Sequence, residues 1–246
     1  MKFEDVCKLQ QKKYRETLGH FLVEGEHLVQ ELERAAITQP ALRASELYVT
    51  HAQSAKTYPF TTHVVTTRQM EKLSETRSPQ GIVAVVPQIE ASPPQPNERA
   101  VCLYEIQDPG NFGNILRTFA WFGGYRCLLL GNCVDPLNAK VVRASMGAIF
   151  HVPVEIDVSV DSIQARYPRI ALLHTEGESI TSSHFRSFDA YLFGNEARGV
   201  PTPVTDALDV IPFVIQGRGA IESLNVATAV NISVYELSRQ EPVHHR

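Results

Sequence analysis

The sequence predicts an α/β protein of two domains, and three observations lead to that prediction. The chain has 246 residues, 43% hydrophobic and 20% charged, which is enough for two modest domains or one large one. Short apolar runs alternate with helix-like segments. A proline-rich stretch over residues 91–99 interrupts this alternation, because proline fits neither a helix interior nor a central strand. We therefore expect a first domain over residues 1–90, a linker over 91–99 and a second domain over 100–246.

The first expected element is an amphipathic helix over residues 1–17, in which Phe3, Val6 and Tyr14 fall on one stripe. The same segment carries four cations within eight residues and no acid between them. Such a patch can neutralise nucleic-acid phosphates, and an ordinary solvated helix face explains it equally well. The four cations are Lys8, Lys12, Lys13 and Arg15.

The remainder of the first domain is predicted to be a small α/β unit. Apolar residues at helical spacing predict a helix over residues 25–36. Short runs rich in β-branched residues predict four strands. These strands cover residues 20–24, 46–50, 62–66 and 81–87.

The second domain is predicted to hold a mainly parallel sheet with helices on both faces. Its strands are rich in Val, Leu and Ile, and helices intervene between them. Strands are expected over residues 100–105, 125–131, 169–175 and 189–195. Helices are expected from about residue 112, over 138–145, and over 223–239 with Ser223 as the N-cap.

Composition excludes several classes of protein. The net charge of −4 argues against a globally basic nucleic-acid binder, so any RNA contact must come from a local patch. No apolar run reaches the roughly 18 residues of a membrane-spanning helix, and the N-terminus does not resemble a signal peptide. Four cysteines without CxxC spacing and nine histidines without HExxH spacing predict neither a metal site nor disulfides. We expect a cytoplasmic protein.

Polar, glycine-rich clusters follow the predicted strands of the second domain, where ligands of open α/β sheets bind. The first cluster, residues 108–123, opens with an Asp-Pro-Gly-Asn turn. Asn111 precedes the following helix, and Arg117 lies within it. A cleft arginine suits bidentate phosphate binding, but a surface arginine that is solvated or paired with a carboxylate fits the periodicity as well.

The second and third clusters carry further polar candidates. Residues 192–201 place Gly194, Glu196 and Arg198 in a tight loop, which could also be a simple turn. The loop lacks the GxxxxGK[ST] pattern of a P-loop. Residues 214–237 place Asn225 in the first turn of the last helix, where it either caps that helix or contacts a ligand.

Together the three clusters resemble the signature of the SpoU–TrmH family of RNA ribose methyltransferases, within the SPOUT superfamily. The resemblance covers residues 100–240, and residues 21–32 and 80–86 are similar to the family's accessory RNA-binding domain. Where the family usually has Ile-Pro-Met, this sequence has Ile215, Gln216 and Gly217. Gln216 and Gly217 therefore depart from the family pattern at positions that the resemblance places beside the adenine of the family's cofactor. The matching residues are Asn111, Gly113 and Arg117; Gly194, Asn195, Glu196 and Gly199; and Glu222, Ser223, Leu224, Asn225, Val226 and Ala227.

This resemblance implies a trefoil-knotted domain, an S-adenosylmethionine cofactor, a homodimer with the RNA site near its interface, and no metal. Arg117 is implied as the catalytic residue, either as a base or, because arginine stays protonated, as a phosphate clamp. The other implied catalytic residues are Asn111, Glu196, Ser223 and Asn225. The implied cofactor-binding residues are Thr175, Glu176, Gly194, Asn195, Ile215, Gln216, Gly217 and Leu224. The RNA-binding candidates are Lys12, Lys13, Arg15 and Arg198.

The predicted reaction is methyl transfer to a ribose 2′-hydroxyl, which RNA has and DNA lacks. The accessory domain favours ribosomal RNA slightly over transfer RNA. The alternative is a non-catalytic RNA-binding or ribosome-assembly protein that keeps the fold. A dinucleotide-dependent oxidoreductase is disfavoured, because no GxGxxG follows the first strand of either domain.

Overall fold

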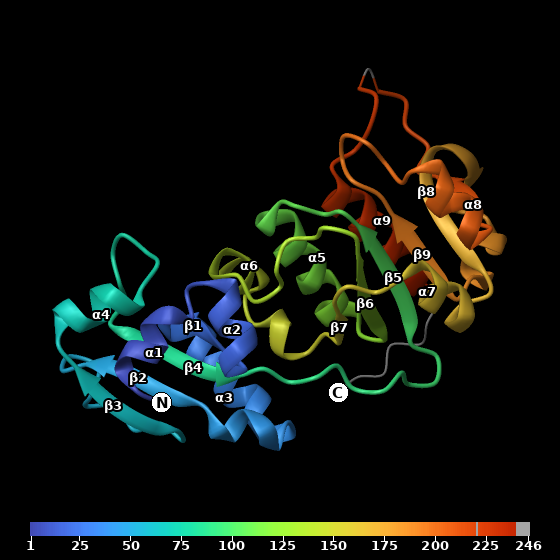
Figure 1. Cartoon of the computed structure of the whole chain (residues 1–246). Coiled ribbons are helices and arrows are strands. Elements are labelled where there is room, and N and C mark those ends of the chain that lie inside the picture. The colour runs from blue at the N-terminus through green and yellow to red at the C-terminus, as the bar shows by residue number, and fades with distance from the viewer. Residues whose placement is uncertain (220, 240–246) are drawn as a thin grey trace. The chain divides into compact units, whose positions relative to one another are not determined.

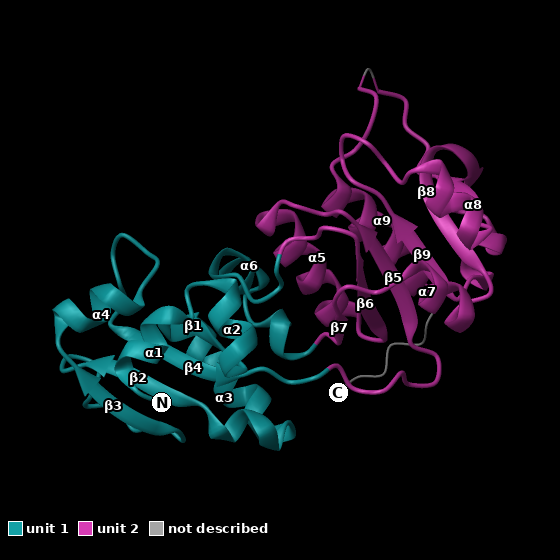
Figure 2. Cartoon of the chain, viewed as in Figure 1, with its two compact units in different colours: residues 1–90, 135–151 teal, residues 91–134, 152–246 magenta. Residues whose placement is uncertain are grey.

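The computed structural model describes residues 1–219 and 221–239, which form two compact units (Figure 2). Unit 1 consists of Met1–Glu90 and Asp135–His151, and unit 2 consists of Ala91–Val134 and the described residues from Val152 onward. Unit 1 is therefore discontinuous in sequence. The sequence pattern assigned residues 135–151 to the second domain, but in the structure they pack with the first.

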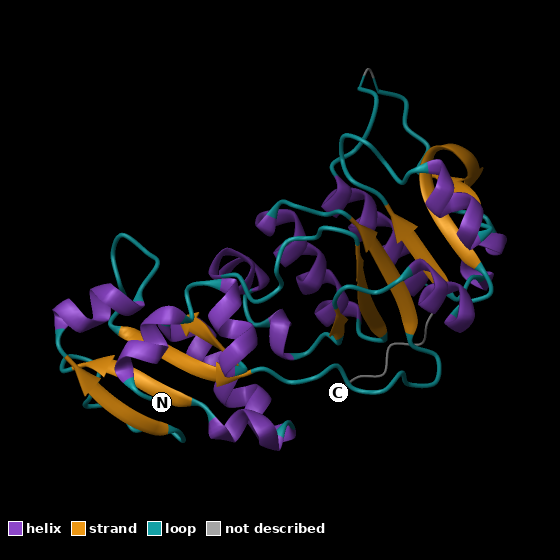
Figure 3. Ribbon diagram, in the orientation of Figure 1, coloured by secondary structure: helices purple, strands orange, loops and turns teal. Residues whose placement is uncertain are grey.

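Unit 1 is built on a four-stranded mixed sheet whose four strands confirm the sequence prediction (Figure 3). The β1–β4 and β4–β2 pairs are antiparallel, and β2–β3 is parallel. In sheet order the strands are β1 (His20–Glu24), β4 (Ile82–Pro87), β2 (Glu46–Thr50) and β3 (Thr61–Val65). The helices of unit 1 are α1 (Phe3–Lys8), α2 (Lys12–Leu18), α3 (Glu26–Thr38), η1 (Pro40–Ala44), α4 (Thr67–Leu73), α6 (Ala139–Ser145) and η2 (Ala148–Phe150).

Segment 135–151 belongs to unit 1 because its apolar side chains complete that unit's core. Val142 and Phe150 pack into the cluster that contains Leu32 of α3. The Gln39 side chain donates to the Phe150 carbonyl at 2.5 Å. A sequence pattern shows that such residues are apolar, but it does not show which sheet they cover.

The prediction of one helix over residues 1–17 was wrong. Helix α1 ends at Lys8, and Gln11 is extended before α2 begins. The break leaves the carbonyls of Leu9 and Gln10 without helical partners, and Arg15 donates to both at 2.9 Å. The same guanidinium pairs with Asp135.

Unit 2 is built on a six-stranded sheet in which every neighbouring pair is parallel, which confirms the predicted fold class (Figure 1). In sheet order the strands are β10 (Ile211–Val214), β8 (Ile170–Ser179), β9 (Ala190–Phe193), β5 (Arg99–Tyr104), β6 (Tyr125–Leu130) and β7 (Val154–Glu155). Its helices are α5 (Pro109–Phe122), α7 (Val160–Arg166), η3 (Ser183–Ser187), α8 (Thr202–Leu208) and α9 (Val226–Ser238).

Helices cover both faces of this sheet, because side chains of β6 that point to opposite faces pack against different helices. Leu128 packs into a cluster that includes Ile163 of α7 and Leu208 of α8. Tyr125, on the opposite face, stacks on Phe119 of α5 with ring centroids 5.6 Å apart. Both faces of the sheet are therefore buried, which explains the continuous apolar runs in the sequence.

Two predicted helix starts were wrong by a few residues. Helix α5 begins at Pro109, with Asp108 accepting from the Asn111 N–H at 2.7 Å, so Asn111 lies in the first turn instead of before it. Helix α9 begins at Val226, and its N-cap is Asn225 instead of Ser223. Each corrected start places an amide side chain at the carboxyl edge of the sheet.

Candidate active site

The candidate site lies where β5 and β9 end. These strands are parallel neighbours, paired up to Leu103 and Phe193, so the segments that follow them leave the same edge of the sheet side by side. The segment after β5 leads to Asp108 and α5, and the segment after β9 forms the loop 194–199.

Loop 194–199 is a turn closed by its own hydrogen bonds. Asn195 and Gly199 exchange backbone hydrogen bonds of 3.2 and 2.8 Å. The Asn195 Oδ1 accepts from the N–H groups of Ala197 and Arg198 at 3.0 and 3.2 Å. A Cβ on Gly194 would lie 2.4 Å from the Gly199 carbonyl carbon, so only glycine allows this approach. Glu196 is held at the exposed tip.

A chain of hydrogen bonds joins the three polar clusters. Asn111 donates from Nδ2 to Glu196 Oε1 at 2.7 Å. Asn225 donates from Nδ2 to Asn111 Oδ1 at 3.0 Å, while its own Oδ1 caps α9. The structure thus brings together one carboxylate and two amides that lie up to 114 residues apart in sequence.

Arg117 lies on the solvent side of α5. Helical geometry places it about 9 Å along the axis from Asn111 and roughly 120° around it. Its side chain is exposed, and no hydrogen bond or ion pair joins it to any described residue. The sequence left open whether Arg117 lies in a cleft, pairs with a carboxylate or is solvated. In the structure its guanidinium is solvated and has no carboxylate partner among residues 1–219 and 221–239.

The remaining cofactor candidates lie at exposed or half-buried positions. Between Pro212 and Phe213 of β10 the register with β8 jumps from Leu172 to Glu178, and the exposed Thr175 and Glu176 lie in the unpaired stretch. Ile215 is half-buried, whereas Gln216, Gly217, Ser223 and Leu224 are exposed.

The four RNA-binding candidates differ in exposure and in their ion pairs. Lys12 and Lys13 are exposed on α2, with Lys12 3.7 Å from Glu16. Arg15 is only 5% exposed and is paired with Asp135, so its guanidinium is not available to RNA. Arg198 is 67% exposed and lies 3.0 Å from Glu105.

Glu105 was not singled out in the sequence, although it directly follows β5. Its carboxylate accepts from Arg198, and its backbone oxygen accepts from Asn195 Nδ2 at 2.9 Å. The only sequence signal was an acidic residue just before the Asp-Pro-Gly-Asn turn, which is too common to be informative.

Two kinds of feature are absent from the described residues. None of their helices combines the length and the apolar character needed to cross a membrane. No three side chains of His, Cys, Asp or Glu gather there as a metal site would require.

Comparison with known protein families matches both parts of the chain. Residues 98–235 match the SpoU rRNA Methylase family, and residues 2–84 match the MRM3-like substrate binding domain. The chain is 33% identical over 244 residues to a 23S rRNA (guanosine(2553)-2′-O)-methyltransferase from Bacillus subtilis, covering 96% of this chain and 95% of that protein. It is 31% identical over 264 residues to an uncharacterized tRNA/rRNA methyltransferase from Synechocystis, covering 95% and 89%.

Solved structures share the same fold. An AdoMet-bound rRNA methyltransferase from Sinorhizobium meliloti matches with a TM-score of 0.80 and 27% identity, over 98% of this chain and 95% of that one. A SpoU methyltransferase from Streptomyces viridochromogenes in complex with AdoMet matches with a TM-score of 0.82 over 97% of both chains. The second is 22% identical and supports the fold alone.

Proposed function

Since the chain belongs to the SpoU rRNA methylase family, we propose that its substrate is ribosomal RNA and that the carboxyl edge of the unit 2 sheet holds its catalytic site. It is an RNA ribose 2′-O-methyltransferase that uses S-adenosylmethionine. The relative from Bacillus subtilis is named for a position in 23S rRNA, and it matches this chain over nearly its full length. The chain of hydrogen bonds from Glu196 through Asn111 to Asn225 is the observation that carries the proposed site.

The residues at this edge fit S-adenosylmethionine. The Glu196 carboxylate complements a sulfonium cation, and the exposed Leu224 and half-buried Ile215 offer apolar surface to an adenine. Thr175 and Glu176 lie in the unpaired stretch of β8 and would border the same ligand. When bound, the cofactor supplies an electrophilic methyl group to the ribose oxygen.

Asn111 and Glu196 are proposed to hold the target ribose, because their side chains fix each other at 2.7 Å. In-line transfer depends on such positioning. Arg117 is proposed as the phosphate clamp: an arginine remains protonated at neutral pH, and its fork binds a phosphate bidentately. In the transfer, the 2′-hydroxyl releases its proton to solvent, its oxygen bonds to the methyl carbon, and the bond from that carbon to sulfur breaks. A guanidinium charge nearby would favour the deprotonated 2′-oxygen that attacks.

Unit 1 is proposed to bind the RNA outside the target nucleotide. Most of its sequence matches a substrate-binding family model, and the exposed Lys12 and Lys13 supply positive charge. Arg15 is left out of this surface because it is buried. The net charge of −4 makes such a local patch necessary for binding RNA.

A homodimer is proposed through the outer surface of α5 and α9. Four large side chains are exposed there, and Trp121 has 85% of its surface accessible. Phe122 and Tyr235 meet edge to face, with centroids 6.4 Å apart, which makes the patch continuous between the helices. An exposed apolar patch of this kind marks an interaction surface, and a second copy of the chain would cover it. The four residues are Trp121, Phe122, Ile232 and Tyr235.

Arg117 lies one turn before Trp121 on the same exposed stripe of α5, so the proposed dimer places the phosphate clamp at the subunit interface. Trp121→Ser should shift the protein from dimer to monomer in analytical ultracentrifugation. An unchanged sedimentation coefficient would show that this face is not the interface.

We also propose that unit 2 is folded as a trefoil knot. The protein is proposed to be cytoplasmic, where its four free cysteines would stay reduced.

The proposed function is tested by mapping 2′-O-methylation in ribosomal RNA from cells with and without the gene. One ribose methyl group should be missing in the deletion strain. It should return with the wild-type protein and not with Glu196→Gln. A 2′-deoxy nucleotide at that position should block transfer in vitro. Loss of a methyl group from transfer RNA alone would refute the ribosomal substrate. Absence of S-adenosylmethionine binding in calorimetry would favour the non-catalytic alternative.

A further inference from the structure

Glu105 has a backbone conformation that its surroundings impose. Its φ is +52°, in the left-handed region that residues other than glycine, asparagine and aspartate rarely adopt. Its N–H donates to the Leu130 carbonyl at 3.0 Å, which ties it to the end of β6. Gly131 leaves space for its side chain, since a Cβ there would lie 3.0 Å from the Glu105 Cγ. The carboxylate is therefore aimed in a defined direction.

Both acceptor groups of Glu105 are used by the loop 194–199. The backbone oxygen accepts from Asn195 Nδ2 at 2.9 Å, and the carboxylate accepts from Arg198 Nη2 at 3.0 Å. These anchors lie on either side of Glu196. The Asn195–Gly199 pair closes the loop, so Glu196 lies in a turn that is tied to Glu105 through both Asn195 and Arg198. These contacts are the basis for linking the position of Glu196 to Glu105.

We propose that Glu105 is a positioning residue that sets the Glu196 carboxylate against Asn111, and that Arg198 is part of this clamp and not an RNA contact. The proposal rests on the proposed function, because it assigns Glu196 to the site of methyl transfer. Arg198 is 67% exposed, and ion pairs on the surface contribute little to stability. The clamp should therefore affect the rate of transfer more than the folding of unit 2.

The test compares Glu105→Gln, Arg198→Gln and the double variant with the wild type. Glutamine keeps the length of the Glu105 side chain and the backbone bond to Asn195, and removes only the charge. Each single variant should lower kcat at saturating RNA about threefold to tenfold. The double variant should be no slower than the slower single variant, because both changes break one interaction. The unfolding temperature should not change measurably.

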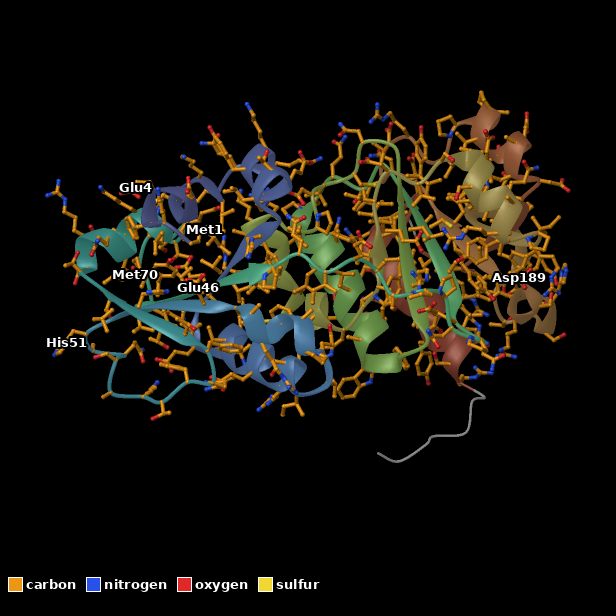
Figure 4. The ribbon with its side chains drawn as sticks, turned by 60° about the horizontal axis from the view of Figure 1, so that its bottom comes forward. Met1, Glu4, Glu46, His51, Met70 and Asp189 are labelled. Carbon is orange, nitrogen blue, oxygen red and sulfur yellow. The ribbon has the colours of Figure 1, made fainter. Side chains whose placement is uncertain are left out.

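A matched control removes a similar exposed ion pair at the other edge of the same sheet. Arg169 and Asp189 lie 2.8 Å apart, just before β8 and β9 begin, and Figure 4 labels Asp189. Asp189→Asn should leave kcat and S-adenosylmethionine affinity unchanged. The exchange variant Glu105→Lys with Arg198→Glu should recover part of the lost rate, since it restores opposite charges.

The salt dependence of RNA binding separates the two roles of Arg198. A positioning role leaves the slope of log K against log salt as in the wild type. A fall of about one unit in that slope for Arg198→Gln, with kcat unchanged, would overturn the proposal and make Arg198 a phosphate contact. Additive losses in the double variant would overturn it as well. If the wild type itself transfers no methyl group to ribosomal RNA, the proposed function has failed instead.

Discussion

Asn225 serves two purposes in the structure, and substitutions can separate them. Its Oδ1 caps α9 by accepting from the N–H groups of Ala227 and Thr228 at 2.9 and 3.3 Å. Its Nδ2 donates to Asn111 at 3.0 Å. Aspartate at this position keeps the cap and loses the donor, whereas alanine loses both. Stability and activity should therefore respond differently to the two changes.

For Asn225→Ala, loss of the cap should destabilise the protein by about 1 kcal/mol. In a chain of this size, that corresponds to a fall of roughly 2–4 °C in the unfolding temperature. Asn225→Asp should unfold near the wild-type temperature, because aspartate is an equally good cap and suits the helix N-terminus. Thermal unfolding followed by circular dichroism measures both.

Methyl transfer should fall strongly in both variants. In Asn225→Asp the Asn111 side chain lies between two carboxylates, Asp at 225 and Glu196, and its single amide nitrogen cannot face both. One contact becomes repulsive, so we expect a loss of at least about 1.4 kcal/mol in transition-state stabilisation, or tenfold in rate. Initial rates with tritiated cofactor measure this loss. Wild-type activity in Asn225→Asp would show that the Asn225–Asn111 contact has no role in transfer.

A second N-cap in unit 2 supplies the control. Ser159 caps α7 by accepting from the Ser162 N–H at 3.2 Å, and α7 packs against the sheet in a cluster that contains none of the site residues. Ser159→Ala should lower the unfolding temperature about as much as Asn225→Ala does, without slowing methyl transfer. If it slows transfer equally, lost stability explains both variants.

Three further predictions concern the site, unit 1 and the edge strand β7 of unit 2. Arg117→Ala should abolish methyl transfer while calorimetry still detects cofactor binding, and retained turnover would exclude Arg117 as essential. The Lys12→Ala, Lys13→Ala double variant should lower the salt slope of RNA binding by about two units, and an unchanged slope would make this face merely solvated. Hydrogen bonds from Arg166, and then from Arg126, hold the pKa of Glu155 below its usual value of 4.5. Its stabilisation is therefore present at neutral pH and lost as pH falls below about 4.5, so the difference in unfolding free energy between the wild type and Glu155→Gln should shrink from pH 7 to pH 3.

The sheet of unit 2 could be predicted because its strands are apolar on both sides, which favours a parallel sheet between two helical layers. The placement of segment 135–151 could not. Val142 and Phe150 are apolar in sequence, but periodicity does not show which core an apolar face covers. The hydrogen bond from Gln39 to Phe150 spans 111 residues, and no local pattern encodes such a contact.

The three site clusters could be predicted from their motifs, but the residues at which the adjoining helices begin could not. Ser223 and Asn225 are both good N-caps, and the structure decides between them, because the Asn225 side chain accepts from the N–H groups of Ala227 and Thr228. Glu105 belongs to no motif in the sequence. Its proposed positioning role rests on a left-handed backbone and on contacts 90 and 93 residues away, which an isolated glutamate in a sequence does not indicate.

The cations of α2 show why residue type alone does not define a binding surface. Lys12, Lys13 and Arg15 lie within four positions of one another, yet only the lysines remain exposed. Between α1 and α2 the carbonyls of Leu9 and Gln10 have no helical partners, and the three nitrogens of the Arg15 guanidinium donate to both carbonyls and to the Asp135 carboxylate. Arg15 is therefore held inside unit 1 by the fork of donors that would also have suited it to a phosphate, whereas Lys12 and Lys13 remain exposed on α2.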